Sequence, residues 1–151
     1  MQNLYVKHLV ALFLLVCLAA VPSGAAEKPK PSTCKQCNMK FADSEKKYAV
    51  YVLEGIEPTA FNDIGCAVIW YNNECAMRQS AFDSNAMAHD FGTEEPIPAE
   101  KAVYVTGPGV KTPKGYGIVA FKSREQAEKF AGGLENGKVM SYSELTALKL
   151  K

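Results

Sequence analysis

Ala49-Val50-Tyr51-Val52 recurs later in the chain as Ala102-Val103-Tyr104-Val105. Both stretches are rich in β-branched and aromatic residues, a composition that favours β-strands. Each is followed by an Ala-Phe pair, Ala60-Phe61 in the first case and Ala120-Phe121 in the second, and by another alanine six residues further on. We therefore expect a duplicated strand-strand-helix-strand (ββαβ) unit and a fold of the α+β class.

The first copy of this unit is expected to begin with strands at 47–53 and 59–61. A helix should follow, because Asn62 or Asp63 can cap it and the next apolar residues are three or four apart. We predict a further strand at 79–88.

The second copy shows the same order of elements. Strands are expected at 101–105 and 116–121, separated by a loop at 107–115 that is rich in Gly and Pro. Ser123 should cap a helix that ends at two consecutive glycines. The last strand is expected at 138–142, followed by a capped C-terminal turn.

The first 26 residues have the pattern of an export signal. Lys7 precedes an apolar run, 9–20, and the small residues of 22–26 suit a signal peptidase. We expect cleavage, release into the periplasm and no membrane insertion of the mature protein. Alternatives are an uncleaved anchor and a lipoprotein attached at Cys17, although Val16 is larger than the residue that normally precedes a lipidated cysteine.

Three segments are expected along the chain. After the signal peptide, 27–33 is expected to be a linker, and 34–150 one compact domain with halves at about 40–92 and 99–148. A mature chain of 125 residues buries about two-thirds of the surface of its unfolded form, which suffices for one core without obligatory disulfides.

The charge balance excludes some classes of partner. Residues 1–26 hold one of the 17 basic and none of the 16 acidic side chains, so the mature chain carries 16 of each. Nucleic acids and anionic membranes need a clustered excess of Lys and Arg, so neither is expected as the main partner. The sequence also lacks a phosphate-binding loop and a recognisable hydrolytic triad, and we do not expect an enzyme.

The densest chemical signal is Cys34-Lys35-Gln36-Cys37-Asn38-Met39, which places two thiols and a thioether within six residues. Thiolate and thioether ligands together select Cu(I) over harder ions. The alternatives are a disulfide and a redox-active pair, although no strand precedes Cys34 as it would in a thioredoxin-like motif. Haem attachment is excluded, because Asn38 stands where a histidine is required.

Other sulfur and nitrogen ligands are few. His89 is the only histidine outside the expected signal peptide and is a candidate third ligand, or else a surface loop residue. Cys66 and Cys75 either form a structural disulfide or remain free thiols, and the sequence does not decide between the two. Cys75 and Met77 form a second Cys-x-Met pair, for which packing is the commoner role.

Three segments of the chain resemble the NosL family of nitrous oxide reductase accessory proteins. These are Cys34-x-x-Cys37-x-Met39, the stretch 98–105, and the stretch 113–121 leading into the helix at 123–128. The resemblance implies two similar ββαβ halves and a periplasmic Cu(I) chaperone that delivers metal to an apo-enzyme, such as nitrous oxide reductase, or to a copper-handling assembly protein.

The resemblance carries the family's Cys-x-Met onto Cys37 and Met39. Two positions differ from the family pattern: Asn38 replaces the usual Gly, and Lys114 replaces a Met before Gly115. Without that Met, the metal ligands expected here are Cys34, Cys37, Met39 and, as a further candidate, His89. The alternative function is an exported thiol oxidoreductase that uses Cys34 and Cys37.

Overall fold

The computed structural model describes residues 33–53 and 58–151. The expected signal peptide and nearly all of the expected linker lie outside these residues. Within them, no helix combines the length and the apolar character needed to cross a bilayer.

The C-terminal half forms a three-stranded antiparallel sheet. Its central strand is β5 (Val103–Thr106), flanked by β6 (Ile118–Phe121) and β7 (Lys138–Met140). Between β6 and β7 lies α4 (Arg124–Gly132), which begins where the Ser123 side chain accepts a hydrogen bond from the Gln126 amide. This is the expected ββαβ order and the expected cap.

The N-terminal half forms a four-stranded antiparallel sheet of order β2-β1-β3-β4. These strands are β1 (Val50–Val52), β2 (Thr59–Phe61), β3 (Ala86–His89) and β4 (Pro96–Pro98). Two helices, α2 (Ile64–Asn73) and α3 (Ala76–Asn85), connect β2 to β3. Mixed helices and antiparallel sheets confirm the α+β class.

Strand pairing repeats residue by residue between the halves. Tyr51 pairs with Ala60 and Met87, and its counterpart Tyr104 pairs with Ala120 and Met140. The three-strand order β2-β1-β3 likewise matches β6-β5-β7. The recurring tetrapeptide therefore marks the central strand of each sheet.

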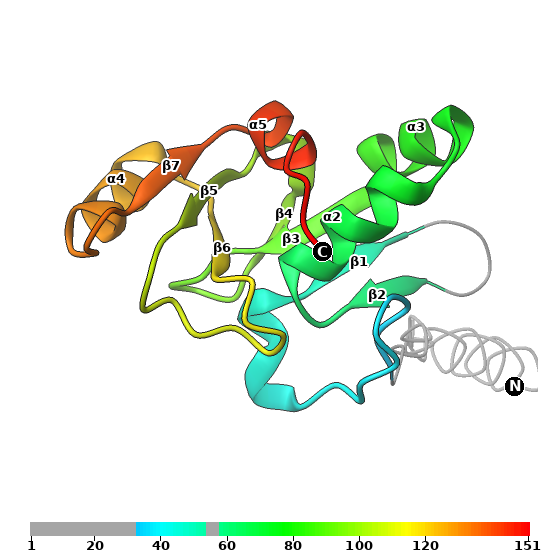
Figure 1. Cartoon of the computed structure of the whole chain (residues 1–151), viewed down its shortest axis with the longest axis horizontal. Coiled ribbons are helices and arrows are strands. Elements are labelled where there is room, and N and C mark those ends of the chain that lie inside the picture. The colour runs from blue at the N-terminus through cyan, green and yellow to red at the C-terminus, as the bar shows by residue number, and fades with distance from the viewer. Residues whose placement is uncertain (1–32, 54–57) are drawn as a thin grey trace, which may run out of the picture.

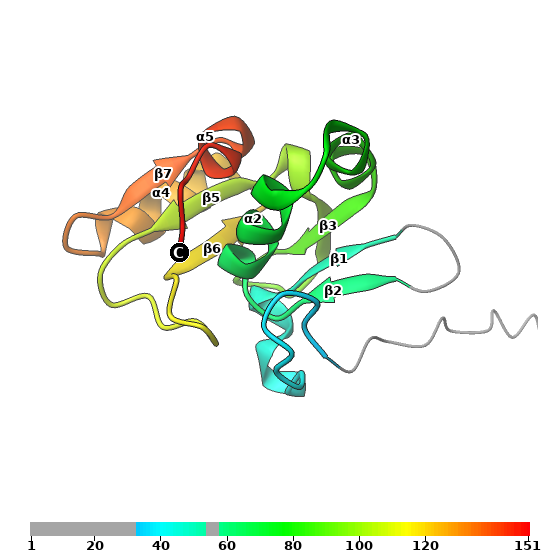
Figure 2. The ribbon, with the colours of Figure 1, turned by 45° about the vertical axis from the view of Figure 1, so that its right-hand side comes forward.

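Buried residues of both sheets pack with α2 in one hydrophobic core, and Figures 1 and 2 show α2 beside the place where the two sheets meet. Strand β6 is buried on both faces: Ile118 and Ala120 join the core with α2, while Val119 and Phe121 pack with α4. A strand covered on both sides needs a continuous apolar sequence, which 118–121 supplies.

The segment at 79–88 corrects one prediction. It is not a strand, because residues up to Asn85 belong to α3 and only 86–89 are extended. Phe82 is the one buried residue of this helix, so its sequence lacks the apolar residues three or four apart that indicate a packed helix. The first half is therefore ββααβ rather than ββαβ.

Smaller elements complete the chain. Short 3₁₀ helices, η2 (Asp43–Tyr48) and η3 (Ala99–Lys101), precede β1 and β5. The C-terminal turn is α5 (Tyr142–Thr146), which Ser141 caps. Figures 1 and 2 both place the segment 33–40 beside β2, below the first turn of α2.

Candidate metal centre

The cysteine motif folds into a tight hairpin. Thr33 and Lys40 form an isolated antiparallel bridge, and between them the Cys34 amide donates to the Met39 carbonyl at 2.8 Å. The Asn38 amide donates back to the Cys34 carbonyl at 2.9 Å. Asn38 has φ 58°, a left-handed conformation that Gly adopts freely and Asn tolerates better than most residues. Asn can thus keep a turn for which Gly is the usual choice.

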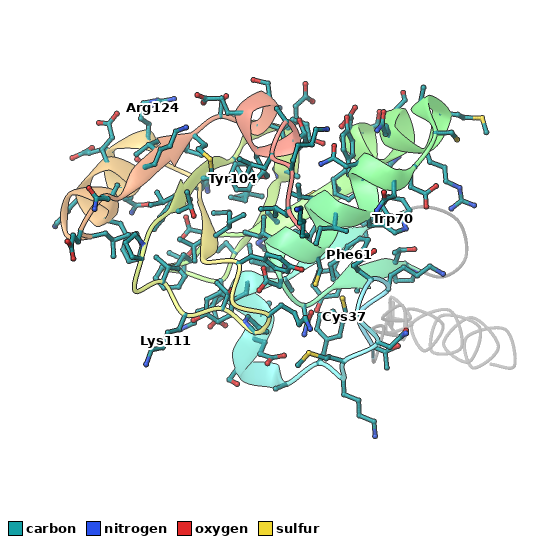
Figure 3. All side chains as sticks on the ribbon, in the orientation of Figure 1. Cys37, Phe61, Trp70, Tyr104, Lys111 and Arg124 are labelled. Carbon is teal, nitrogen blue, oxygen red and sulfur yellow. The ribbon has the colours of Figure 1, made fainter. Side chains whose placement is uncertain are left out.

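This hairpin is attached to the edge of the first sheet. The Lys35 amide donates to the carbonyl of Ala60 in β2 at 2.8 Å. Figure 3 shows Cys37 in the hairpin, below Phe61 and the start of α2. Backbone hydrogen bonds therefore fix the position of both hairpin cysteines relative to the helix.

The third cysteine comes from the first turn of α2. Asp63 caps the helix by accepting a hydrogen bond from the Gly65 amide at 2.9 Å, as expected for one of the two candidate caps. Cys66 is then the third helical residue. Negative charge is favoured at this end of a helix, where free amides and the helix dipole meet.

The ligand sulfur atoms of Cys34, Cys37 and Cys66 all lie within 4.8 Å of one another. Cys34 and Cys66 are buried, and Cys37 is half-buried. Metal–thiolate bonds of about 2.3 Å, as in zinc sites, separate the sulfurs of one site by about 4 Å, so a small contraction would bring all three onto one ion. Soft sulfur donors suit Cu(I) or Zn²⁺ and not the hard cations.

The thiols share protons unequally. The Cys66 thiol donates a hydrogen bond to the Cys34 sulfur, which also accepts from the backbone amides of Asn62, Cys37 and Gln36. These donors lower the pKa of Cys34 to about 5, although burial opposes the shift. The hydrogen bond to Cys34, with burial, raises the pKa of Cys66. These contacts therefore favour the thiolate on Cys34 and keep the shared proton on Cys66. A soft metal would take the place of the shared proton.

A second segment packs against this centre from the C-terminal half. The Asp63 carboxylate accepts bonds from the Thr112 hydroxyl at 2.6 Å and the Lys114 amide at 2.9 Å. The ring of Tyr116 lies over Gly65, so closely that a Cβ there would overlap it. Burial raises the pKa of Tyr116, and the nearby charges of Cys66 and Asp63 raise it further.

The NosL family model matches residues 27–149. The chain belongs to the NosL family. NosL proteins are accessory copper chaperones, so the expectation that the chain is not an enzyme is confirmed by its family.

A solved structure has the same fold. The copper chaperone NosL from Shewanella denitrificans matches with a TM-score of 0.58 and 16% sequence identity, over 82% of this chain and 96% of that one. No curated protein matches the sequence. The family and the three-cysteine cluster together support a copper-binding chaperone role for this NosL protein.

The structure brings together two of the four predicted ligands of this NosL chain and adds one. Cys34 and Cys37 are in the cluster, and Cys66 joins them as a third candidate ligand. Met39 lies in the same hairpin with 39% of its surface exposed. His89 does not join the three-cysteine group: it is buried in β3, and its Nδ1 lies 3.2 Å from the Ala49 carbonyl oxygen.

The fourth cysteine is separate from this cluster. Cys75 is exposed at the start of α3 and Cys66 is buried, and both are free thiols, so the structure does not form the disulfide considered from the sequence. Met77 is 79% exposed, which also excludes the core-packing role considered for it.

Cys66 is the candidate ligand that the sequence analysis did not predict. The signal was present, because Asp63 followed three residues later by Cys66 puts a thiol in the first turn of a capped helix. What the sequence does not show is that the hairpin lies beside that turn. Asn62 was considered only as a helix cap, yet it contacts two of the cysteines.

Proposed function

We propose that this NosL protein binds one Cu(I) through Cys34, Cys37 and Cys66 and passes it to a copper-accepting protein. The observation that supports the proposal is the convergence of three thiols within 4.8 Å, two of them buried. Three soft anionic donors favour Cu(I), and binding would displace the remaining thiol protons to solvent.

Met39 is proposed as the ligand on the solvent side. Its exposed side chain follows Cys37 by two residues, and its backbone is fixed to Cys34. The ligands then range from the fully buried Cys34 through the half-buried Cys37 to the exposed Met39. An acceptor can approach from the Met39 side without entering the core.

We further propose that the protein works in the periplasm and that the acceptor is an exported apo-enzyme such as nitrous oxide reductase, or an assembly protein that serves it. Support for this comes from the apolar run at 9–20, its small-residue flank and the family to which the chain belongs. Mass spectrometry of the protein from a periplasmic extract tests it, since a mature mass beginning near residue 27 is expected.

A Cu(I) competition assay against a chelator, under reducing conditions, tests the metal site. Cys37→Ser and Cys66→Ser should each weaken binding by about 100-fold or more, above the effect of losing an outer-shell contact. Met39→Leu should weaken it less. The second Cys-x-Met pair provides a matched control, because Cys75→Ser and Met77→Leu change the same atoms at an exposed site.

Native mass spectrometry should show one copper per reduced chain, and X-ray absorption should count three or four sulfur neighbours. Parent-like affinity in both Cys37→Ser and Cys66→Ser would refute the site.

The oxidoreductase alternative has less support, since the stabilised thiolate is Cys34, which is 0% exposed and cannot reach a protein disulfide. Insulin reduction dependent on Cys34 would revive it.

A further inference from the structure

Asn62 carries an unexplained donor beside the metal centre. Across residues 33–53 and 58–151, its Nδ2 is the one buried side-chain nitrogen or oxygen atom without a hydrogen-bond partner. The residue is 0% exposed, so water does not satisfy it from the surface. Buried amide donors without partners are rare in folded proteins, and each calls for a reason.

The position of Asn62 connects it to the cysteines. It lies between the end of β2 and the helix cap Asp63. Its backbone amide donates to the Cys34 sulfur, while its side-chain Oδ1 accepts from the Cys37 thiol at 3.6 Å. One residue therefore contacts both hairpin sulfurs and still has a free side-chain donor.

The contact with Cys37 suits a thiol and does not suit a metal-bound sulfur. A thiol can donate its proton to Oδ1, but a thiolate on a metal has no proton and only accepts. Once the Cys37 proton has left to solvent, Oδ1 and the sulfur are two acceptors facing each other. A half-turn of the amide group exchanges its oxygen and nitrogen at nearly constant volume.

We propose that Asn62 is a positioning residue for the metal, whose side-chain amide turns over on metal binding and then donates an N–H···S hydrogen bond from Nδ2 to the Cys37 sulfur. This inference rests on the proposed function of the three-cysteine cluster. The N–H···S bond to a negatively charged sulfur is stronger than the neutral thiol contact that it replaces, so Asn62 favours the loaded state. It also spreads the negative charge that three thiolates bring to a buried site.

Nuclear magnetic resonance of the parent protein tests the turn directly. After loading with ¹¹³Cd(II), which binds thiolates and is itself observable, one Asn62 Nδ2 hydrogen should show scalar coupling to cadmium through the N–H···S bond. The same ¹⁵N side-chain signal should shift on loading with Cu(I). A purely structural amide would show neither effect, and absence of both would overturn the proposal.

A variant adds an independent measurement. Asn62→Leu keeps a similar size and removes both polar atoms, and it should weaken Cu(I) binding about tenfold, at the low end of the 10–100-fold range for outer-shell partners. Asn72→Leu is the matched control, because Asn72 lies at the other end of α2 and its Nδ2 donates to Leu148. Its Cu(I) affinity should equal that of the parent.

The outcomes separate this inference from the proposed function. If the parent does not bind Cu(I) through thiolates, the three-cysteine site itself is wrong. If the parent binds Cu(I) through thiolates but Asn62→Leu binds it equally well, only the role of Asn62 is wrong. The same holds if the Asn62 side-chain signal of the parent does not respond to metal. Urea unfolding of metal-free Asn62→Leu confirms that the variant folds, and the resonance experiment needs no variant.

Discussion

The backbone amide of Lys114 donates to the carboxylate of Asp63, which also caps the helix that carries Cys66. The loop 107–117 is thus tied to Asp63 through the Lys114 backbone and the Thr112 hydroxyl, and not through the lysine side chain, which is exposed. Figure 3 shows Lys111 of the same loop pointing away from Cys37 into solvent. Position 114 can therefore change its side chain without losing its anchor.

Replacing Lys114 with Met should tighten Cu(I) binding. The change removes a cation from the neighbourhood of a bound cation and supplies a thioether next to Gly115. Lys114→Gln separates the two causes, because it removes the charge without adding sulfur. Chelator competition measures affinity, and X-ray absorption should show an added sulfur for Lys114→Met alone. An unchanged affinity and sulfur count would show that this loop does not reach the metal.

Asp63→Ala should destabilise the protein far more than Ser123→Ala, its equivalent in the second repeat. Within the described part of the chain, the buried Asp63 carboxylate accepts from Gly65, Thr112 and Lys114, whereas the Ser123 hydroxyl accepts from the Gln126 amide alone among backbone donors. Loss of a cap costs about 1 kcal/mol, and the two other bonds to the carboxylate raise the cost for Asp63 to about 3 kcal/mol or more. Urea denaturation measures the free energy of unfolding of each variant. Equal losses in Asp63→Ala and Ser123→Ala would contradict the bridging role of Asp63.

The metal-free protein should contain one thiolate that titrates near pH 5. Hydrogen bonds from Cys66 and from backbone amides lower the pKa of Cys34 to about 5, whereas an unfolded cysteine titrates near pH 9. The folded state therefore binds fewer protons between these values, and the stability contributed by Cys34 is lost as pH falls through about 5. Above pH 9 the raised pKa of Cys66 has the opposite effect, and stability falls.

Ultraviolet thiolate absorbance between pH 4 and 8 follows the folded state directly. The low-pH step should disappear in Cys34→Ser and persist in Cys75→Ser. A first thiolate that forms only near pH 8 in the parent would contradict the arrangement of donors around Cys34.

His89→Gln should lower stability without changing the copper site. His89 packs edge-on against Tyr51 and its ring nitrogen faces the Ala49 carbonyl. Burial lowers the pKa of His89 below 6.5, so the unfolded chain takes up a proton first and stability is lost as pH falls below that value. The variant should lose this part of the pH dependence. A reduced ligand count in X-ray absorption would instead place His89 on the metal.

Gly65→Ala should displace the Tyr116 ring and loosen the loop 107–117. Overpacking of this kind typically costs about 1–3 kcal/mol. Gly132→Ala is the control, because a Cβ there meets nothing within 4 Å and should be neutral or mildly stabilising. If the ring is the cause, adding Tyr116→Ala to Gly65→Ala should recover part of the lost stability, as thermal unfolding would show.

The duplicated strands could be predicted from sequence because they depend on local patterns. The Tyr-centred tetrapeptides form the middle strands, and Asp63 and Ser123 cap the helices as expected. Helix α3 was missed because few of its residues are buried, so its apolar periodicity is weak. Cys66 was missed as a ligand because its meeting with the hairpin depends on the Lys35–Ala60 contact, a long-range bond that no local pattern records.

The residue-by-residue match of the two sheets has a consequence for copper stoichiometry. The strand–helix junction that provides Asn62 and Cys66 in the first repeat provides Lys122 and Gln126 at the corresponding positions of the second. An ammonium and a neutral amide are poor ligands for a soft ion. Of the two similar strand–helix junctions, only the first therefore offers a soft ligand, so each molecule should carry a single copper ion per delivery.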